Sequence, residues 1–94
     1  MSGLQFEWDP AKARENLRKH GVSFEEAATA FGDRLAITID DDEHSTPEED
    51  RFVTIGATQR HLIVVVCHTD RHGTIRLISA RKANKHEREQ YYAI

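Results

Sequence analysis

The sequence predicts an α+β domain in which an antiparallel meander sheet carries two N-terminal helices and one C-terminal helix. Three features lead to this class. A short strand and two capped helices open the chain, four strand-like segments then follow one another through short connections, and a polar helical segment ends it. Consecutive strands joined by short loops pair antiparallel. The 94 residues suit one domain spanning 1–94.

The first two elements are a strand and a helix. Residues 4–8 alternate apolar and polar side chains, which is the pattern of a short half-buried strand. Asp9 followed by Pro10 is typical of a helix start, because aspartate accepts from a free N–H group and proline suits the first turn. We expect this helix to span residues 10–20 and to end at Gly21, which accepts a left-handed conformation.

A second helix and the second strand follow. Ser23 and Glu26 form a capping box, which predicts a short helix that ends at Gly32. Residues 35–40 alternate apolar and polar side chains and predict a strand. The segment 40–50 is acidic, contains a proline and lacks periodicity, so we expect a loop.

The second half of the chain contains three more strands and the last helix. Residues 51–58 alternate, whereas residues 62–67 are continuously apolar, which indicates a central strand covered on both faces. Residues 70–73 predict a hairpin turn with glycine at the position that requires a positive φ. The returning strand covers residues 74–80, and we expect a polar helix over residues 81–92.

Composition excludes several classes of protein. No apolar run approaches the roughly 20 residues of a membrane span, and residues 1–10 lack the pattern of a signal peptide. The single cysteine, Cys67, excludes an internal disulfide and an all-cysteine zinc site. We therefore expect a cytoplasmic protein without membrane association.

The charges are divided unevenly along the chain. Residues 1–50 contain 13 acidic and 5 basic side chains, whereas residues 51–94 contain 3 acidic and 8 basic ones. Four of the six histidines also lie in the second half. This division fits a basic surface that meets a polyanion, and it fits equally a fold in which the two halves neutralise each other.

Three arginines are the strongest candidates for phosphate contacts. Arg71, Arg76 and Arg81 lie at the turn, on the last strand and at the start of the predicted last helix. The guanidinium group donates paired hydrogen bonds and keeps its charge, which suits phosphate. Strand alternation places Arg76 on the face of Ile78 and Ala80, where it needs an anionic partner. An internal ion pair is the favoured partner, from Glu7, Asp9 or Glu48.

The histidines divide into candidate and surface groups. Lys19 and His20 end the first helix, where the helix dipole favours cations, so their charge has a structural explanation as well as a functional one. His44 follows the acidic residues 40–43, and a divalent cation bound there is a minor alternative. His68 is expected at the surface beside the hairpin turn.

The sequence also resembles a known family. The strings KHGVSFEEA at residues 19–27 and IRLISARKA at residues 75–83 are similar to those of the BrnT toxin family, and further matches cover nearly the whole chain in order. The resemblance implies a RelE-like fold and a bacterial type II toxin that cleaves RNA and inhibits translation without a cofactor. It also implies a BrnA-like ribbon-helix-helix antitoxin as partner, through which the toxin contacts operator DNA.

The resemblance leads to a hypothesis about the mechanism. A RelE-like nuclease needs no metal, because the RNA's own 2′-OH attacks the phosphorus. Arginines would stabilise the developing charge, and a histidine would transfer protons. The residues assigned to catalysis are Arg71, Arg76, Arg81, His20 and His44, and those assigned to substrate binding are Lys19, Arg51 and Lys82.

Two alternatives stay open at this point. The chain could be a catalytically silent module that binds a partner and takes part in the autoregulation of its operon. Arginines that are paired with acidic residues inside the fold would favour that reading. It could also be a metal-dependent phosphodiesterase that uses the acidic cluster at residues 40–44.

Overall fold

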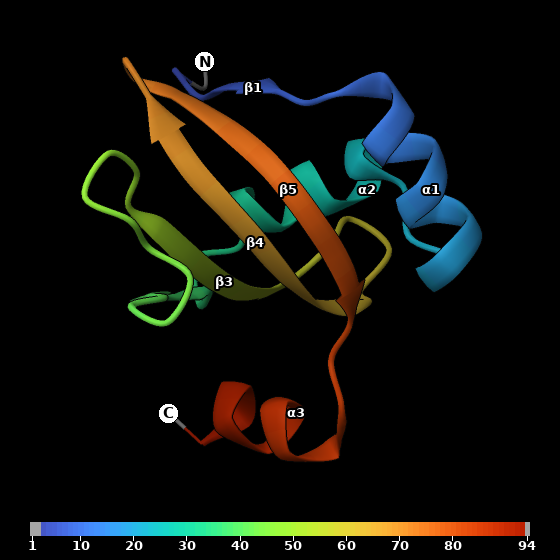
Figure 1. The fold of residues 1–94 in the computed structure, drawn as a ribbon. Helices are drawn as coiled ribbons and strands as arrows, with labels where there is room; N and C mark the ends of the chain where they lie inside the picture. The colour runs from blue at the N-terminus through green and yellow to red at the C-terminus, as the bar shows by residue number, and fades with distance from the viewer. Residues whose placement is uncertain (1–2, 94) are drawn as a thin grey trace.

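A five-stranded sheet with helices on both faces forms the protein (Figure 1). The computed structural model describes residues 3–93. The strands are β1 (Gln5–Glu7), β2 (Ile37–Asp40), β3 (Arg51–Ala57), β4 (Ile63–Arg71) and β5 (Thr74–Lys82). The helices are α1 (Pro10–His20), α2 (Phe24–Thr29) and α3 (Lys85–Tyr92), and a 3₁₀ turn, η1 (Ala30–Gly32), extends α2.

The sheet confirms the α+β class and differs from the prediction at one edge. Its strand order is β1-β5-β4-β3-β2, and β2 to β5 form the expected antiparallel meander with β4 at the centre. β1, however, pairs parallel to β5, with Phe6 opposite Ile75, so the sheet is mixed. Parallel pairing is possible because the chain leaves β1 through α1 and α2 before it enters the meander.

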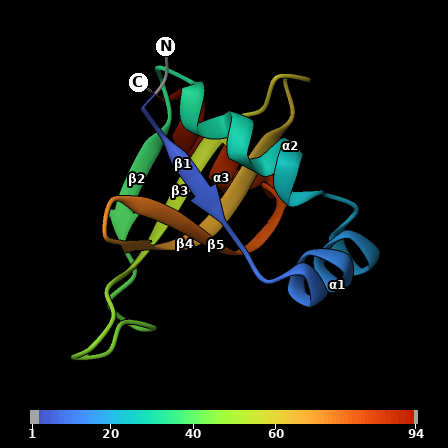
Figure 2. The same ribbon diagram turned by 90° about the horizontal axis from the view of Figure 1, so that it is seen from above.

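The two faces of the sheet carry separate cores. On the α2 face, α1 and α2 cover the larger core, which contains Val22, Phe24, Ala27, Ala30, Val64, Val66, Leu77 and Ala80. On the opposite α3 face, α3 covers a smaller core of Ile55, Ile63, Val65, Ala83 and Tyr91. Figures 1 and 2 show α3 at one end of the sheet, while the loop 41–50 projects from the other end. The α3 face is therefore only partly covered by α3.

Capping and a buried asparagine fix α1 against the sheet. Asp9 caps the start of α1, and Gly21 ends it with φ of 71°. Asn16 is buried, and its amide donates to the carbonyl oxygens of Val22 and Ala80 at 2.9 and 2.8 Å. The Asn16 side-chain oxygen accepts from the Ala80 N–H at 3.0 Å. Three hydrogen bonds from one side chain thus join α1 to the start of α2 and to β5.

A β-bulge in the β4–β5 pairing corrects the predicted orientation of Arg76. Cys67 pairs with Ser79 and the next residue, His68, pairs with Leu77, so Ile78 has no partner on β4. Beyond this extra residue, each side chain of β5 points to the face opposite to the one that regular alternation would give it. Ala80 consequently lies in the α2-face core, whereas Arg76 lies on the α3 face, and the predicted shared face is wrong.

The last helix starts later than the sequence predicts. Arg81 and Lys82 continue β5, opposite Val65 and Val64 of β4. Asn84 caps α3 and forms a capping box with Glu87, so the helix begins at Lys85. The strand continues because its ladder with β4 outweighs the helix tendency of these two basic residues. The prediction that Arg81 begins a helix is therefore wrong.

The hairpin turn lies where the sequence predicts it, whereas β2 begins later than predicted. The hairpin between β4 and β5 turns at His72 and Gly73, which have φ of 54° and 86°, as expected for a two-residue turn. β2 begins at Ile37 rather than at residue 35. The reason is that the Asp33 carboxylate accepts the Leu35 N–H at 3.0 Å and bends the chain there.

Candidate active site

Three arginines gather on the α3 face at the end away from α3. Arg51 on β3 and Arg76 on β5 both pair with Thr69 of β4, so the three residues form one row across the sheet. With strands about 4.8 Å apart, the Cα atoms of the two arginines are about 10 Å apart, with both side chains on the same face. Arg71 follows Thr69 by two positions and shares this face. We call Arg51, Arg71 and Arg76 the arginine cluster.

Carboxylates border the arginine cluster. Glu49 lies 3.1 Å from Arg51 and 3.7 Å from Arg71, and Glu7 bonds to Arg76 at 2.9 Å. The pair with Glu7 confirms the expected internal partner of Arg76. The arginine side chains remain 30–53% exposed. Ion pairs at this exposure contribute only about 0–1 kcal/mol, so a phosphate group can compete with the carboxylates.

His44 is linked to the β3 end of this row through Asp41. The Asp41 N–H donates to the Arg51 carbonyl oxygen at 2.8 Å, which places Asp41 beside Arg51. The Asp41 carboxylate oxygens lie 2.9 and 3.1 Å from Nδ1 of His44. Ser45 secures the loop, since its hydroxyl donates to the Asp41 carbonyl and accepts the Arg51 N–H. The imidazole is therefore oriented through Nδ1, and its side chain is 61% exposed.

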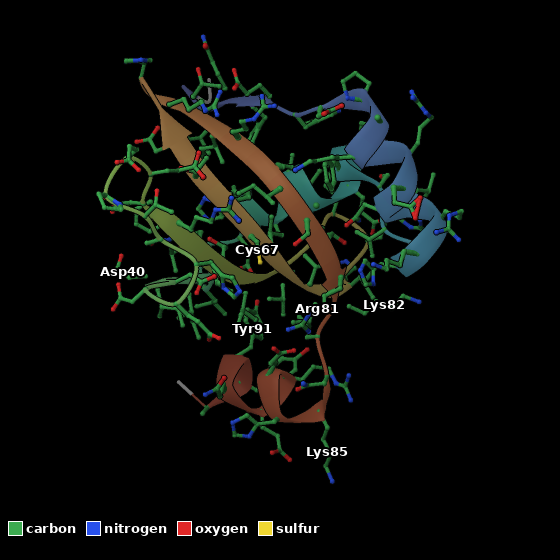
Figure 3. All side chains as sticks on the ribbon, in the orientation of Figure 1. Asp40, Cys67, Arg81, Lys82, Lys85 and Tyr91 are labelled. Carbon is green, nitrogen blue, oxygen red and sulfur yellow. The ribbon has the colours of Figure 1, made fainter. Side chains whose placement is uncertain are left out.

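Arg81 lies at the opposite end of the α3 face. It is five residues from Arg76, or roughly 15 Å along the strand. Two hydrogen bonds of 2.7 and 2.8 Å join its guanidinium to Glu87 of α3, and they raise the pKa of Arg81 and lower that of Glu87. Figure 3 shows Arg81 near the end of β5 that lies above α3, and Asp40 at the opposite edge of the view.

The remaining predicted residues lie outside the arginine cluster. Lys82 pairs with Val64, so it belongs to the α2 face, and Figure 3 shows it on the side of α1. Lys19 and His20 are exposed in the last turn of α1. Lys82 lines a hollow of about 300 Å³ together with Gly21, which directly follows His20. The structure therefore divides the predicted residues into two groups on different faces.

His68 differs most from its expected position. It was predicted at the surface but is only 7% exposed, between the rings of Phe31 and Phe52. Burial lowers its pKa to about 4, with a smaller opposing effect from the Asp70 charge. One feature of the sequence could have predicted this burial, because His68 continues the alternation of Val64 and Val66 on the core face of β4.

A hollow of about 790 Å³ adjoins the arginine cluster. Its lining includes Arg71, Thr69, Phe52 and the acidic loop residues Glu48 and Glu49. Within residues 3–93, no three His, Cys, Asp or Glu side chains are grouped so as to hold a metal ion. The metal-dependent alternative at residues 40–44 therefore lacks a ligand set in the described part of the chain. No helix in that part is long and apolar enough to cross a membrane.

Comparisons with known proteins identify the fold and the family of the chain. The fold is similar to the crystal structure of the ribonuclease toxin BrnT of Brucella abortus, with a TM-score of 0.66 and 21% sequence identity, over 87% of this chain and 99% of that one. No curated protein matches the chain. Residues 8–87 match the family model of the ribonuclease toxin BrnT of type II toxin–antitoxin systems. The chain belongs to this BrnT toxin family.

Proposed function

We propose that the protein is a metal-independent endoribonuclease whose site is the arginine cluster. The observation that carries the proposal is the convergence of Arg51, Arg71 and Arg76 on one exposed sheet face, to which Asp41 links the imidazole of His44. Arginine is suited to phosphate because it donates paired hydrogen bonds and stays charged. The family description as a ribonuclease toxin supports RNA as the substrate class.

The proposed reaction is an internal displacement at a phosphodiester. The ribose 2′-oxygen forms a bond to phosphorus while the bond from phosphorus to the 5′-oxygen breaks. One proton leaves the 2′-OH and another reaches the departing 5′-oxygen, so the products are a 2′,3′-cyclic phosphate and a 5′-OH. The protein must stabilise extra negative charge on the phosphate oxygens and transfer these protons.

The geometry supports separate roles for the cluster and for His44. Arg51 and Arg76 flank Thr69 and can contact one phosphate from two sides, with Arg71 beside them. Asp41 holds Nδ1 of His44, which leaves Nε2 for proton transfer. Arg81 would contact RNA at a distance from the reacting phosphate, because it lies at the other end of the face. Lys19, His20 and Lys82 take no part in this proposed centre.

The proposal extends to the biological context. A toxin of a type II system is paired with a protein antitoxin. We infer a BrnA-like ribbon-helix-helix antitoxin, contact with operator DNA through that partner, inhibition of translation and a location in the cytoplasm. The acidic first half of the chain would repel RNA, so it suits the antitoxin or solvent better than the substrate.

One observation favours the second candidate function. Arg51, Arg71, Arg76 and Arg81 all contact carboxylates in the structure. Such internal pairing is expected of a catalytically silent module that binds its partner and helps repress its operon. The two functions are separated by whether the free protein cleaves RNA.

The test combines bacterial growth arrest with cleavage of total RNA by purified protein in EDTA. Arg76→Ala and Arg51→Ala should each lower the cleavage rate by about 10²–10³-fold and abolish arrest, since each removes a charge at the phosphate. Arg18→Ala is the matched control, because Arg18 is an exposed arginine of α1 that also pairs with a glutamate, Glu15. Folded wild-type protein that neither cleaves RNA nor arrests growth would favour the binding module.

A further inference from the structure

A third hollow lies on the α2 face, at the end of the sheet nearest the hairpin turn. It has a volume of about 360 Å³, and its lining includes Thr38, Phe52, His68, Asp70 and Ile75. This volume is at the lower end of the range for small-molecule sites. Apolar and aromatic walls with a few polar groups are the usual composition of such a site. Neither the arginine cluster nor the proposed reaction uses this hollow.

The ring of His68 is held on three sides. Its centroid lies 5.8 Å from that of Phe52, nearly parallel, and 4.9 Å from that of Phe31, edge to face. Nε2 shares a hydrogen bond with the Thr54 hydroxyl at 2.8 Å, and Thr54 shares another with Thr38 at 2.7 Å. The ring is therefore fixed in position and orientation before any ligand binds.

The other ring nitrogen, Nδ1, is left available for a ligand. No residue from 3 to 93 gives Nδ1 of His68 a hydrogen bond, although every fully buried polar side-chain atom in that range has a partner. Nδ1 is therefore reached by solvent, and His68 lines this hollow. Because burial lowers the pKa of His68 to about 4, the ring is neutral at pH 7 and offers one uncharged donor or acceptor.

A carboxylate faces the same space. Asp70 lines the hollow, and its charge acts on the titration of His68, so the two groups are close. A carboxylate accepts two hydrogen bonds side by side. The lining thus combines a paired acceptor, an uncharged ring nitrogen and an aromatic wall. No lysine or arginine is among the residues that line it.

We infer that this hollow binds a nucleobase of the RNA substrate and prefers guanine; the inference rests on the proposed ribonuclease function. Guanine carries two adjacent donors, N1–H and the exocyclic amino group, that match the Asp70 carboxylate. Its N7 and O6 acceptors match a donating Nδ1–H of His68. Adenine has the acceptor N1 where guanine has N1–H, and uracil and cytosine have the acceptor O2 where guanine has its amino group, so each would place an acceptor against the negative carboxylate. Unpaired bases are commonly recognised by stacking on aromatic side chains and by bonds to their edges.

The hollow is placed to act together with the arginine cluster. Phe52 and Asp70 line both this hollow and the larger one that contains Arg71. Asp70 and Arg71 are consecutive on β4, so their side chains point to opposite faces of the sheet. A nucleotide whose base contacts Asp70 would carry its phosphate around the sheet end toward Arg71.

Titration of the isotope-labelled full chain with the four nucleoside 3′-monophosphates tests the base preference by NMR. We expect 3′-GMP to shift the His68 ring and Phe52 amide signals with at least tenfold higher affinity than the other three. Asp70→Asn should remove this preference, and the side chain is exposed, so folding should be retained. Glu25→Gln, which removes an exposed charge on α2, should leave it intact. Equal affinities, or shifts confined to other residues, would overturn the inference.

Mapping the 5′-OH ends of cleaved RNA separates this inference from the proposed function. If wild type cleaves preferentially next to guanosine and Asp70→Asn cleaves without base preference, both the guanine site and the ribonuclease proposal are supported. Cleavage without base preference overturns the guanine site and leaves the ribonuclease proposal standing. Binding of 3′-GMP at His68 without any RNA cleavage supports the base site and refutes the ribonuclease proposal. If only a purified antitoxin shifts the His68 signals, the hollow is a protein-docking site and the inference fails.

Discussion

The hydrogen bond between Tyr91 and Asp33 should be a main link between α3 and the rest of the fold. The Tyr91 hydroxyl donates to the Asp33 carboxylate at 2.5 Å, and the same carboxylate accepts the N–H groups of Ala57 and Leu35 at 2.8 and 3.0 Å. A hydrogen bond to a charged group contributes about 1.5–3 kcal/mol. Tyr91→Phe keeps the buried ring and removes this bond, so we expect a loss near the lower limit, about 1.5 kcal/mol.

Asp33→Asn should cost more than Tyr91→Phe. An asparagine can retain two of the three bonds in weaker neutral form, but its amide nitrogen then faces the Leu35 N–H. Loss of one bond and weakening of two gives about 3 kcal/mol. For a chain of this size, these losses correspond to a fall in Tm of about 4–8 °C per kcal/mol.

Urea unfolding of both variants and of the double variant measures the coupling. We expect the two single losses to exceed the double loss by about 1 kcal/mol, because the residues share a bond. Additive losses within about 0.3 kcal/mol would show that the Tyr91–Asp33 bond does not stabilise the fold. Tyr92→Phe provides the control, because Tyr92 is the exposed neighbour of Tyr91 and is 69% exposed.

The same bond predicts two pH effects. Burial acts to raise the pKa of Asp33, but the bonds from Tyr91, Ala57 and Leu35 together outweigh burial and lower it. The contribution of Asp33 to the free energy of unfolding is therefore complete above its unfolded pKa of about 4. It is lost as pH falls through the lower pKa of the folded state. The bond to Asp33, with burial, raises the pKa of Tyr91 to about 12, so its contribution is lost as pH rises from about 10 toward that value.

Three further predictions concern the packing of the sheet. Asn16→Ala removes three buried hydrogen bonds, two of them to Ala80, and should cost about 3 kcal/mol or more in urea unfolding; a loss below about 1 kcal/mol would contradict this role. Gly56→Ala should cost about 1–3 kcal/mol, because the new Cβ would lie 3.0 Å from the Ala30 carbonyl oxygen; an unchanged urea midpoint would refute the close approach. Since the folded pKa of His68 is lowered to about 4, wild type should lose about 3 kcal/mol as pH falls from 6.5 to 4, and His68→Gln should lack this dependence in acid titrations.

Local signals in the sequence were sufficient for most of the elements. The Asp9 and Ser23 caps, the Gly21 helix end and the turn at His72 and Gly73 all lie where the pattern placed them. Each depends on residues within a few positions of one another, so the chain itself contains the information. The prediction of a central strand also held, because a continuously apolar segment has to be covered on both faces.

Features that depend on distant partners could not be predicted in this way. The parallel pairing of β1 depends on where two helices bring it, and the extension of β5 through Arg81 and Lys82 depends on its ladder with β4. His68 was expected at the surface beside the hairpin turn, although it continues the alternation of Val64 and Val66 on the core face of β4. Its burial depends on Phe31 and Phe52, which come from separate elements.

The candidate site shows the same division between side-chain chemistry and position. The choice of Arg71 and Arg76 followed from the chemistry of the guanidinium group, and Glu7 was among the expected partners of Arg76. Nothing in the sequence placed Arg51 opposite Thr69 or Asp41 beside Arg51, because both depend on how β3 pairs with its neighbours. The structure consequently separates residues that were predicted to form one site. Lys82, for example, lies on the α2 face, whereas the arginine cluster lies on the α3 face.

The bulge at Ile78 explains why the two faces differ in character. Arg76 and Arg81 are an odd number of positions apart, so an uninterrupted strand would place them on opposite faces. The extra residue puts both on the α3 face and turns Leu77 and Ala80 into the α2-face core. If Ile78 were deleted, Leu77 and Ser79 would follow one another opposite His68 and Cys67, and Arg76 and Arg81, then four positions apart, would still share the α3 face. We therefore expect a chain without Ile78 to fold with both arginines on the α3 face, as Ile78→Val should, and a deletion variant that fails to fold would contradict this account of the bulge.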